Sequence, residues 1–276
     1  MKRTINILYI FTMMLVEGLA LSGCNNARQK QLDTTQSFTA NGVEFKVAMV
    51  EAGTFRMGYE GTDTSKCEFL KPRHEVTLTK DFYISQTEVT QELWEAVMDT
   101  NPSHFHGAQL PVENVSWEDC DLFIAKLNEI TGKKFRMPTE AEWEFAAKGG
   151  NRSMGYIYSG SNTIGEVAWF GQDDGHAYPD GNSGETTHPV AQKKANELGI
   201  YDMSGNVWEW CRDWFGKYPA EPQNNPLCNA DFIGRVVRGG GYASMKEYCY
   251  TSERNFHEPT YHDRFVGLRL ALDARP

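Results

Sequence analysis

The stretch from Asn151 to Pro189 constrains the fold of this chain more than any other feature, because it is long and has little hydrophobic periodicity. It is dense in Gly, Asp, Asn and Ser, as in the run GQDDGHAYPDGNSGETTHP. Such a composition is typical of loops rather than of amphipathic helices or alternating strands. Loops of this length are uncommon in compact domains and usually need an additional tie, such as a bound ion. We therefore expect a domain rich in irregular structure.

Short strands are predicted on both sides of this stretch. Residues 43–50 (VEFKVAMV) place alternate apolar side chains on one face, which is the period-two pattern of a half-buried strand. Further short strands are expected at residues 54–57, 75–79, 82–86, 235–238 and 267–272. No repeat or linker divides residues 42–273, so we predict one α+β domain.

Three helices are predicted between residues 90 and 150, and each has a start signal. The second shows apolar residues at i, i+3, i+4 and i+7 spacing, and the third opens with a capping box. Several Glu residues lie at the start of the third predicted helix. Carboxylates are stabilised at the positive end of the helix dipole, so these residues need no catalytic role. The predicted caps are Thr90 before 91–98, Ser116 before 117–131 with Gly132 as the stop, and Thr139 with Glu142 before a helix that ends at Gly149.

The first 23 residues are predicted to be a secretory signal peptide. A basic start, a short apolar core and small residues before a cleavage point are typical of such peptides. The phrase Leu21-Ser22-Gly23-Cys24 is similar to a bacterial lipobox, in which cleavage before Cys24 is accompanied by acylation of its thiol. The alternative is an ordinary signal peptide with an incidental cysteine. Several acyl chains anchor a protein stably, so we expect a lipid-anchored protein of the bacterial cell envelope that faces the periplasm or the cell surface.

Residues 24–41 are predicted to be the acylated cysteine and a flexible tether, because NNARQKQLDTTQSFTA is polar and has no periodicity. The folded domain is then expected over residues 42–276. The chain has 27 Lys and Arg residues against 37 Asp and Glu residues, a formal net charge of -10. Nucleic acid is not an expected partner, because its binding requires concentrated basic residues. No apolar stretch reaches the roughly 18 residues of a membrane-spanning helix.

Seven phrases in colinear order resemble the formylglycine-generating enzyme, or sulfatase-modifying factor, domain family. They cover about residues 42–273. The resemblance implies that family's variant of the C-type-lectin-like fold, which is α+β and low in regular structure. The phrases are GTFRMG (53–58), TEVTQELWEAVM (87–98), LPVENVSWEDC (110–120), FRMPTEAEWEFAAKGG (135–150), LGIYDMSGNVWEWCRDW (198–214), RVVRGGGY (235–242) and VGLRLAL (266–272).

The enzymes of this family are implied to bind copper(I) through two cysteines and to use oxygen to convert a substrate cysteine to formylglycine. Soft thiolates are the ligands that select copper(I). Here only the second cysteine is present, as Cys249, while Ser244 stands at the first position and Gly241 at the active-site serine. A serine hydroxyl is a poor copper(I) ligand, and Met245 is a weaker substitute, so copper is not expected. Cys249 is a candidate catalytic residue only if the chain is an enzyme.

The resemblance also implies a calcium site before the WEW phrase. The family's ligands there match Asp202, Gly205, Val207 and Glu209. A mixture of carboxylate and backbone carbonyl oxygens suits this hard cation. The alternative is that Asp202 is a turn residue and that Glu209 is a buried, hydrogen-bonded acid.

The remaining cysteines and histidines give weaker signals. Five cysteines remain beside Cys24, so at least one thiol is unpaired even where disulfides form. Cys211 and Cys228 are close enough in sequence to pair, although spacing alone leaves the connectivity open. His104 and His106 lie in a loop without a third ligand, so they are expected at the surface.

Together these features favour a non-catalytic binding or scaffold module anchored in the cell envelope. The expected partners are an envelope protein, peptidoglycan or a glycan, and the membrane is reached through the N-terminal lipid. The alternative is a copper-dependent formylglycine-generating oxidase that converts a sulfatase cysteine to formylglycine at a site around Cys249.

Overall fold

The structure is a computed structural model that describes residues 34–59, 68–173, 176–229 and 233–274. The chain divides into two units, residues 1–36 and 37–276, and only residues 34–36 of the first unit are described. The predicted signal peptide, Cys24 and Cys67 lie outside the described residues. The elements after the first strand all belong to the second unit.

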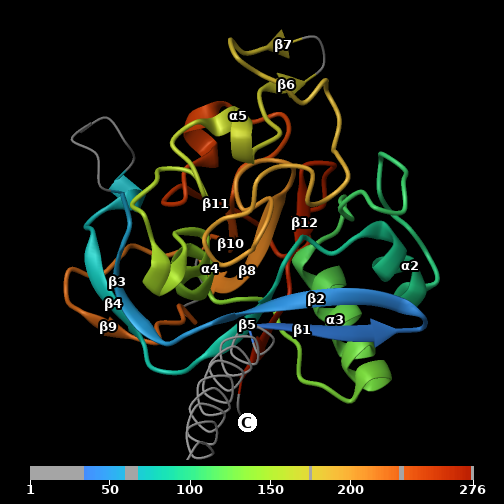
Figure 1. Cartoon of the computed structure of the whole chain (residues 1–276), viewed down its shortest axis with the longest axis horizontal. Helices are drawn as coiled ribbons and strands as arrows, with labels where there is room; N and C mark the ends of the chain where they lie inside the picture. The colour runs from blue at the N-terminus through green and yellow to red at the C-terminus, as the bar shows by residue number, and fades with distance from the viewer. Residues whose placement is uncertain (1–33, 60–67, 174–175, 230–232, 275–276) are drawn as a thin grey trace, which may run out of the picture. The chain divides into compact units, whose positions relative to one another are not determined.

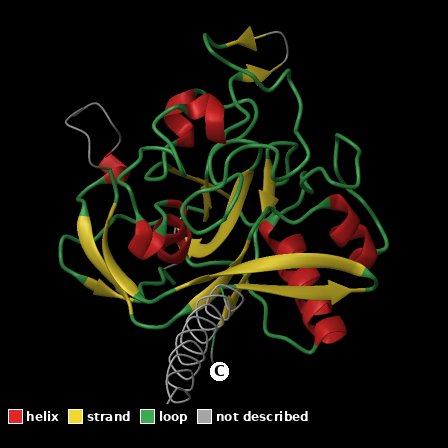
Figure 2. Cartoon of the chain, viewed as in Figure 1, coloured by secondary structure: helices red, strands yellow, loops and turns green. Residues whose placement is uncertain are grey.

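The described strands are mostly short (Figure 2). They are β1 (Thr35–Ala40), β2 (Val43–Val50), β3 (Gly53–Met57), β4 (His74–Leu78), β5 (Phe82–Ser85), β6 (Gln172–Asp173), β7 (His176–Ala177), β8 (Trp208–Trp214), β9 (Gln223–Asn224), β10 (Arg235–Arg238), β11 (Arg254–His257), β12 (Val266–Leu268) and β13 (Ala271–Asp273). In the described part of the chain they form sheets of order β1-β2-β5-β13, β11-β10-β8-β12 and β3-β4-β9, and a ribbon of β6 and β7 (Figure 1).

The helices begin where the capping signals predict them, although α4 ends at Ala147, two residues before the predicted stop at Gly149. Thr90 caps α2 (Gln91–Met98), and Thr139 with Glu142 forms the predicted capping box of α4 (Glu140–Ala147). Ser116 and Asp119 form a further box at α3 (Trp117–Thr131), which stops at Gly132 in the left-handed conformation. The short elements are α5 (Ile164–Val167) and the 3-10 turns η1 (Glu68–Leu70), η2 (Gly150–Arg152) and η3 (Lys246–Cys249).

Strand β8 lies between two hydrophobic cores. In Figure 1, β8 and β10 are central, with α4 on one side and α2 and α3 on the other. Successive residues of a strand face opposite directions. Trp210 accordingly joins the core that packs on α3, whereas Cys211 joins the core that contains Trp143 of α4. The expected α+β architecture is therefore confirmed, with its central sheet buried on both faces.

The predicted tether ends earlier than its sequence indicates. Thr35–Ala40 fall within the predicted tether, but they form β1 beside β2. Phe38 packs against Phe45 and Phe135, with ring centroids 5.8 and 5.1 Å apart. The strand lies at a sheet edge, where polar side chains are common, so its composition is similar to that of a linker.

The predicted strand at residues 267–272 is two strands that belong to different sheets. β12 pairs parallel with β8, and β13 pairs antiparallel with β5. The chain crosses between the sheets at Arg269 and Leu270, which are both fully buried. The alternating leucines therefore do not mark a solvent face.

Residues 151–189 are irregular, as predicted, apart from η2, α5 and the β6–β7 ribbon. The Gln172 amide donates to the Tyr242 carbonyl at 3.1 Å, and the Ser183 hydroxyl donates to the same oxygen at 2.9 Å. The His188 amide donates to the Asn206 side chain at 2.9 Å. These hydrogen bonds supply part of the tie that a loop of this length needs.

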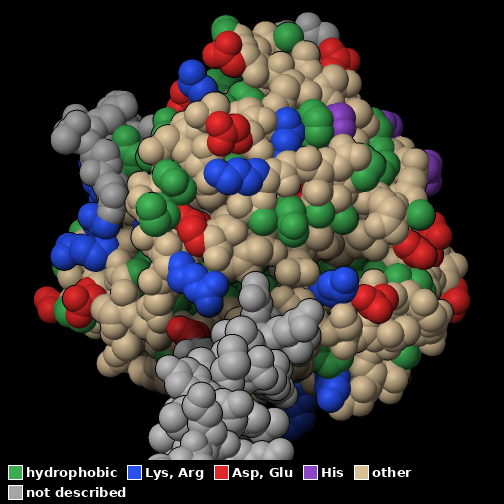
Figure 3. All heavy atoms as spheres, in the orientation of Figure 1, with side chains coloured by type: hydrophobic (Ala, Val, Ile, Leu, Met, Phe, Trp, Pro, Cys, Tyr) green, Lys and Arg blue, Asp and Glu red, His purple; other side chains and the backbone are tan. Residues whose placement is uncertain are grey.

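The surface of the described residues is mixed in character. On the face shown in Figure 3, basic side chains are interspersed with acidic and neutral ones. In the described part of the chain, no helix is long and apolar enough to cross a membrane. Large apolar side chains stand out of the surface at Leu122, Ile130, Met154, Ile157, Tyr178, Ile233 and Tyr248.

Candidate functional site

A hollow of about 320 Å³ lies where the resemblance places the first copper ligand. Ser244 and Met245 form part of its wall. Its wall combines aromatic rings with polar groups, as many ligand sites do. We call it the aromatic hollow, and its other lining residues are Tyr178, Trp208, Ala243, Tyr248, Asn255, His257, Tyr261 and Phe265.

A glycine turn positions the serine in this wall. Gly239 and Gly240 have φ angles of 97° and 73°, in the left-handed region that favours glycine. A Cβ atom on Gly240 would lie 2.8 Å from the Sγ of Cys249, so this glycine also permits a close approach. The Gly241 amide donates to the Ser244 hydroxyl at 2.9 Å, which fixes that side chain at the edge of the hollow.

Cys249 is turned away from the aromatic hollow. It is fully buried in a small core with Tyr158 and Phe170, and its thiol donates to the Met245 carbonyl at 3.9 Å. Burial raises the pKa of the Cys249 thiol. Buried, protonated thiols are chemically inert. The structure thus brings Ser244 and Met245 to the hollow but does not bring Cys249 to it.

Three buried carboxylates, Glu88, Asp202 and Glu209, gather around the buried guanidinium of Arg269. Arg269 donates to both oxygens of Glu209, at 2.7 Å from Nη2 and 2.9 Å from Nε. The indole N–H of Trp143 donates to the same carboxylate at 2.6 Å. Glu209 is therefore neutralised by a bidentate partner inside the protein.

Glu88 and Asp202 are held mainly by neutral donors. Glu88 accepts hydrogen bonds from the Asn206 side chain at 3.0 Å and the Val207 amide at 3.3 Å. Asp202 accepts one from the Ala191 amide at 2.7 Å through Oδ2, while its buried Oδ1 makes no hydrogen bond within the described structure. Burial is the main cause that raises the pKa of Glu88, and the nearby carboxylates of Asp202 and Glu209 add to it. Burial, with a smaller contribution from Glu209, raises the pKa of Asp202 to about 6. The cluster thus holds more acidic groups than Arg269 can neutralise.

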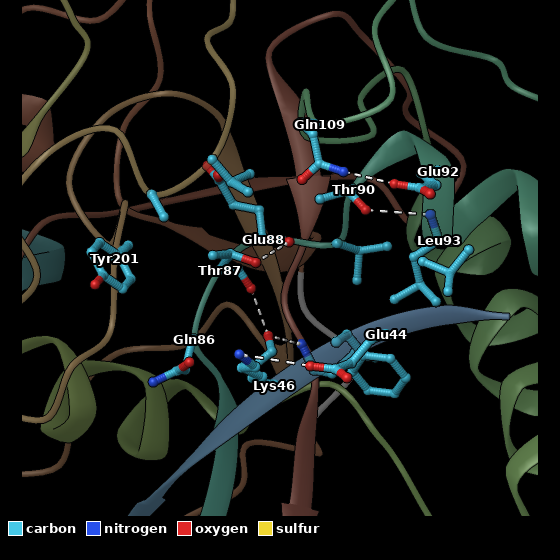
Figure 4. Close-up of a pocket in the computed structure, with 17 residues that line it drawn as sticks. Glu44, Lys46, Gln86, Thr87, Glu88, Thr90, Glu92, Leu93, Gln109 and Tyr201 are labelled. Atoms are coloured by element: carbon cyan, nitrogen blue, oxygen red, sulfur yellow. Dashed lines mark hydrogen bonds and ion pairs between the residues drawn. The ribbon is translucent and has the colours of Figure 1, made fainter. Parts of the chain in front are cut away.

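A second hollow, of about 390 Å³, adjoins this acidic cluster (Figure 4). Glu88 and Ala191 both line it, so it lies beside the acids rather than beside the aromatic hollow. Figure 4 shows Lys46 of β2 and Tyr201 among its other walls. Of the three acids, only Glu88 lines it.

The predicted calcium ligands fit a cation only in part. The free Oδ1 of Asp202 suits one, because a buried oxygen without a partner is costly. Glu209, in contrast, is already engaged by Arg269 and Trp143. A Cβ atom on Gly205 would lie 2.3 Å from the backbone carbonyl oxygen of Trp169, so the two backbones are in close contact. The Val207 amide donates a hydrogen bond to Glu88. Within the described residues no three His, Cys, Asp or Glu side chains converge on a metal position, so the calcium site stays a prediction.

Sequence reasoning missed Glu88 and Arg269. Both lie inside phrases that carry the family resemblance, TEVT and GLRLAL. A charged residue within the apolar run GLRLAL was the available signal, because a fully buried arginine needs an acidic partner. That partner, Glu209, lies 60 residues earlier in the chain.

The weaker sites are now placed. Cys211 is a free thiol, as are Cys120 and Cys249, so Cys211 and Cys228 do not pair with each other. His104 and His106 are exposed in their loop, as predicted.

The chain is similar in sequence and in structure to known proteins. The family described as "Sulfatase-modifying factor enzyme 1-like domain" matches residues 34–274. "Chaperone protein LppX" of Paenibacillus barcinonensis is 38% identical over 239 residues, which cover 72% of this chain and 79% of that protein. The "Formylglycine-generating enzyme" of Streptomyces coelicolor is 34% identical over 59% of this chain, which spans only 53% of the enzyme's own length. The solved "Treponema denticola variable protein 1" superposes with a TM-score of 0.75 at 33% identity, covering 87% of this chain and 99% of that one.

Proposed function

Because the chain belongs to the sulfatase-modifying factor enzyme 1-like domain family, and has that family's C-type-lectin-like α+β fold, we propose that it is a non-catalytic member that binds other proteins. The binding site is the aromatic hollow. One observation carries this proposal: Ser244 stands in the wall where the enzymes have a copper-binding cysteine, while Cys249 is buried behind it. A site of this composition offers apolar contact area instead of thiolate ligands.

The partner in this proposal is a polypeptide with exposed apolar side chains. The relative named as a chaperone supports it, because this chain aligns with 79% of that protein. Tyr178 and Tyr248 are 41% and 40% exposed at the rim of the hollow, so their rings are available to a partner without rearrangement. We infer that the protein holds incompletely folded clients.

The site of action in this proposal is the cell envelope, where a lipid on Cys24 holds the protein. The lipobox-like phrase supports the anchor, and so does the name LppX of the relative, which suggests a lipoprotein. Cys24→Ala is expected to move the protein from the membrane fraction to the soluble fraction after cell disruption. Cys228→Ala serves as the control that leaves it in the membrane. Retention of Cys24→Ala in the membrane would refute the anchor.

Suppression of aggregation tests the binding role. The full-length protein in nanodiscs is mixed with chemically reduced insulin, and light scattering follows precipitation of the insulin B chain. We expect suppression that weakens several-fold in Tyr248→Ala. Leu122→Ala is the matched control, because Leu122 is 51% exposed on α3 and does not line the hollow. Suppression that is absent, or equal in both variants, would contradict the proposal.

The alternative function is formylglycine generation, which the relatives named as formylglycine-generating enzymes favour. It is tested by supplying the same protein with copper(I), oxygen, a thiol reductant and a cysteine-containing sulfatase-type peptide. Mass spectrometry then looks for conversion of the cysteine to the aldehyde. We expect no conversion beside an active control enzyme. Conversion that disappears in Cys249→Ala would establish the alternative.

A further inference from the structure

A third hollow, of about 250 Å³, shares no lining residue with the aromatic hollow. We call it the tyrosine hollow, and its lining residues are Tyr59, Lys148, Gly155, Tyr156, Ile157, Tyr250, Thr251 and Ser252. Tyr59 follows β3, Lys148 follows α4, and the other residues belong to two loop segments. The proposed client site therefore makes no use of these residues.

Backbone hydrogen bonds hold the walls of the tyrosine hollow together. The Thr251 amide donates to the Ile157 carbonyl at 2.9 Å, which joins the two loop segments. The Tyr59 amide donates to the Leu70 carbonyl at 3.1 Å. A site that is fixed before binding loses little conformational entropy when a ligand arrives.

Three residues in these walls have hydrogen-bonding capacity that the protein does not use. Ser252 is only 8% exposed, and neither its hydroxyl nor that of Tyr156 makes a hydrogen bond within the described structure. The Lys148 ammonium has three N–H donors. It donates to the Arg56 carbonyl at 3.0 Å and to Glu144 at 2.7 Å, so one donor remains. A ligand that replaces water on these groups must carry hydrogen-bonding groups of its own.

The remaining wall is aromatic and apolar. The rings of Tyr59, Tyr156 and Tyr250 line the hollow together with Ile157, which is 48% exposed. Aromatic rings offer flat apolar faces. A pyranose ring has flat C–H faces and a rim of hydroxyls, so it matches both kinds of wall. The volume is below the roughly 300–1,000 Å³ of sites for drug-sized molecules, which suits a single sugar ring.

The charges around the tyrosine hollow favour a neutral ligand. Of its described lining residues Lys148 alone is charged, and Glu144 pairs with it at 2.7 Å. Charges of both signs lie further out, because Arg73 interacts electrostatically with Glu144, and Glu247 with Tyr250. Complementary charge selects partners, and here it selects neither an anion nor a cation.

We propose that the tyrosine hollow binds one N-acetylhexosamine unit of a glycan. The sugar hydroxyls exchange hydrogen bonds with Ser252 and Tyr156. The remaining donor of Lys148 requires an acceptor, which the acetamido carbonyl supplies, and the acetamido methyl group packs on Ile157. This inference goes beyond the proposed function, because it adds a second site for a different class of ligand.

Saturation-transfer difference NMR with three small probes tests the ligand class. The probes are methyl N-acetyl-β-glucosaminide, methyl β-glucoside, which lacks the acetamido group, and N-acetylalanine methylamide, which lacks the sugar ring. Each is titrated into the full-length protein in nanodiscs, with empty nanodiscs as the blank. We expect the acetylated glycoside to bind several-fold more tightly than either of the other probes.

Two conservative variants test the place of binding. Ser252→Ala and Tyr156→Phe each remove one hydroxyl, and each should weaken binding of the acetylated glycoside about two- to tenfold, as for the loss of one hydrogen bond. Tyr178→Phe is the matched control, because it removes a hydroxyl from a partly exposed tyrosine of the aromatic hollow and should leave the affinity unchanged. Urea denaturation of the three variants checks that they are equally folded.

The outcomes distinguish the two proposals. Equal affinity for the two glycosides, tighter binding of the alanine derivative, or no binding of any probe would overturn N-acetylhexosamine as the ligand. An affinity that changes in neither Ser252→Ala nor Tyr156→Phe would overturn the tyrosine hollow as the site. Suppression of insulin aggregation should persist in both variants, so the loss of one proposal leaves the other standing.

Discussion

Neighbouring residues of β8 lie in two contrasting environments. Glu209 is fully buried, and Arg269 and Trp143 satisfy its carboxylate. Trp208, one residue earlier, lines the aromatic hollow. The centroid of its ring lies 6.3 Å from that of the partly exposed Tyr248. Glu209 thus joins the sheets together, while Trp208, itself buried, lies beneath an exposed tyrosine at the wall of the hollow. Stability and client binding should therefore respond to different substitutions.

The largest change in the free energy of unfolding is expected when the buried ion pair of Glu209 and Arg269 is broken. Glu209→Gln removes the carboxylate that the buried Arg269 guanidinium holds in a bidentate pair, which lowers the free energy of unfolding by about 3–5 kcal/mol. Urea denaturation followed by tryptophan fluorescence measures it. The double variant Glu209→Met with Arg269→Met removes both charges and should recover part of the loss. A loss below about 1 kcal/mol in Glu209→Gln would mean that the pair does not hold the sheets together.

Asp202→Asn is expected to cause a smaller change, an increase in the free energy of unfolding, when calcium is removed by a chelator. Asp202 has a folded pKa of about 6, above the ordinary 3.8, so its protonated form stabilises the fold below about pH 4. That contribution is lost as the pH rises through 6. Asp202→Asn keeps an acceptor for the Ala191 amide without the charge. It should be more stable than the native chain by about 1–3 kcal/mol at pH 7.5.

Urea denaturation at pH 4, 6 and 7.5 checks this prediction. The advantage of Asp202→Asn should shrink towards zero at pH 4, because the native carboxyl is then protonated as well. A loss of stability that is equal at all three pH values would show that burial does not penalise the charged form of Asp202.

Calcium sharpens the same comparison, because it would add the cation that the acidic cluster lacks. At ten times its dissociation constant, a bound ion raises the free energy of unfolding by about 1.4 kcal/mol. We expect millimolar calcium to raise the melting temperature of the native chain but not that of Asp202→Ala, with magnesium as the control ion. An unchanged melting temperature of the native chain would indicate that the acidic cluster around Arg269 binds no calcium.

Local signals were enough to predict the helices. Thr90, Ser116 and Thr139 cap their helices as expected, because a capping bond depends on residues within one turn. β8 was not predicted, since its sequence WEWCRDW is buried over most of its length and shows no alternation between solvent and core. β1 was missed for the opposite reason, because its polar edge is similar to a tether.

The candidate site was predictable only in part. The resemblance points to Ser244 and Cys249, but it could not show that one lines the hollow while the other is buried. The Arg269 side chain donates to the backbone carbonyl of Ser85, 184 positions earlier in the chain. No local pattern encodes such contacts.

The smallest effect on stability is expected where the effect on binding is large. Tyr248 is 40% exposed, so Tyr248→Ala should change the free energy of unfolding by no more than about 0.5 kcal/mol. The same variant should weaken the suppression of insulin aggregation several-fold. Urea denaturation and light scattering on one preparation measure both quantities. A loss of 2 kcal/mol or more, of the size expected for a core residue, would mean that the wall of the aromatic hollow is part of the core. Binding could then not be separated from folding on this face of β8.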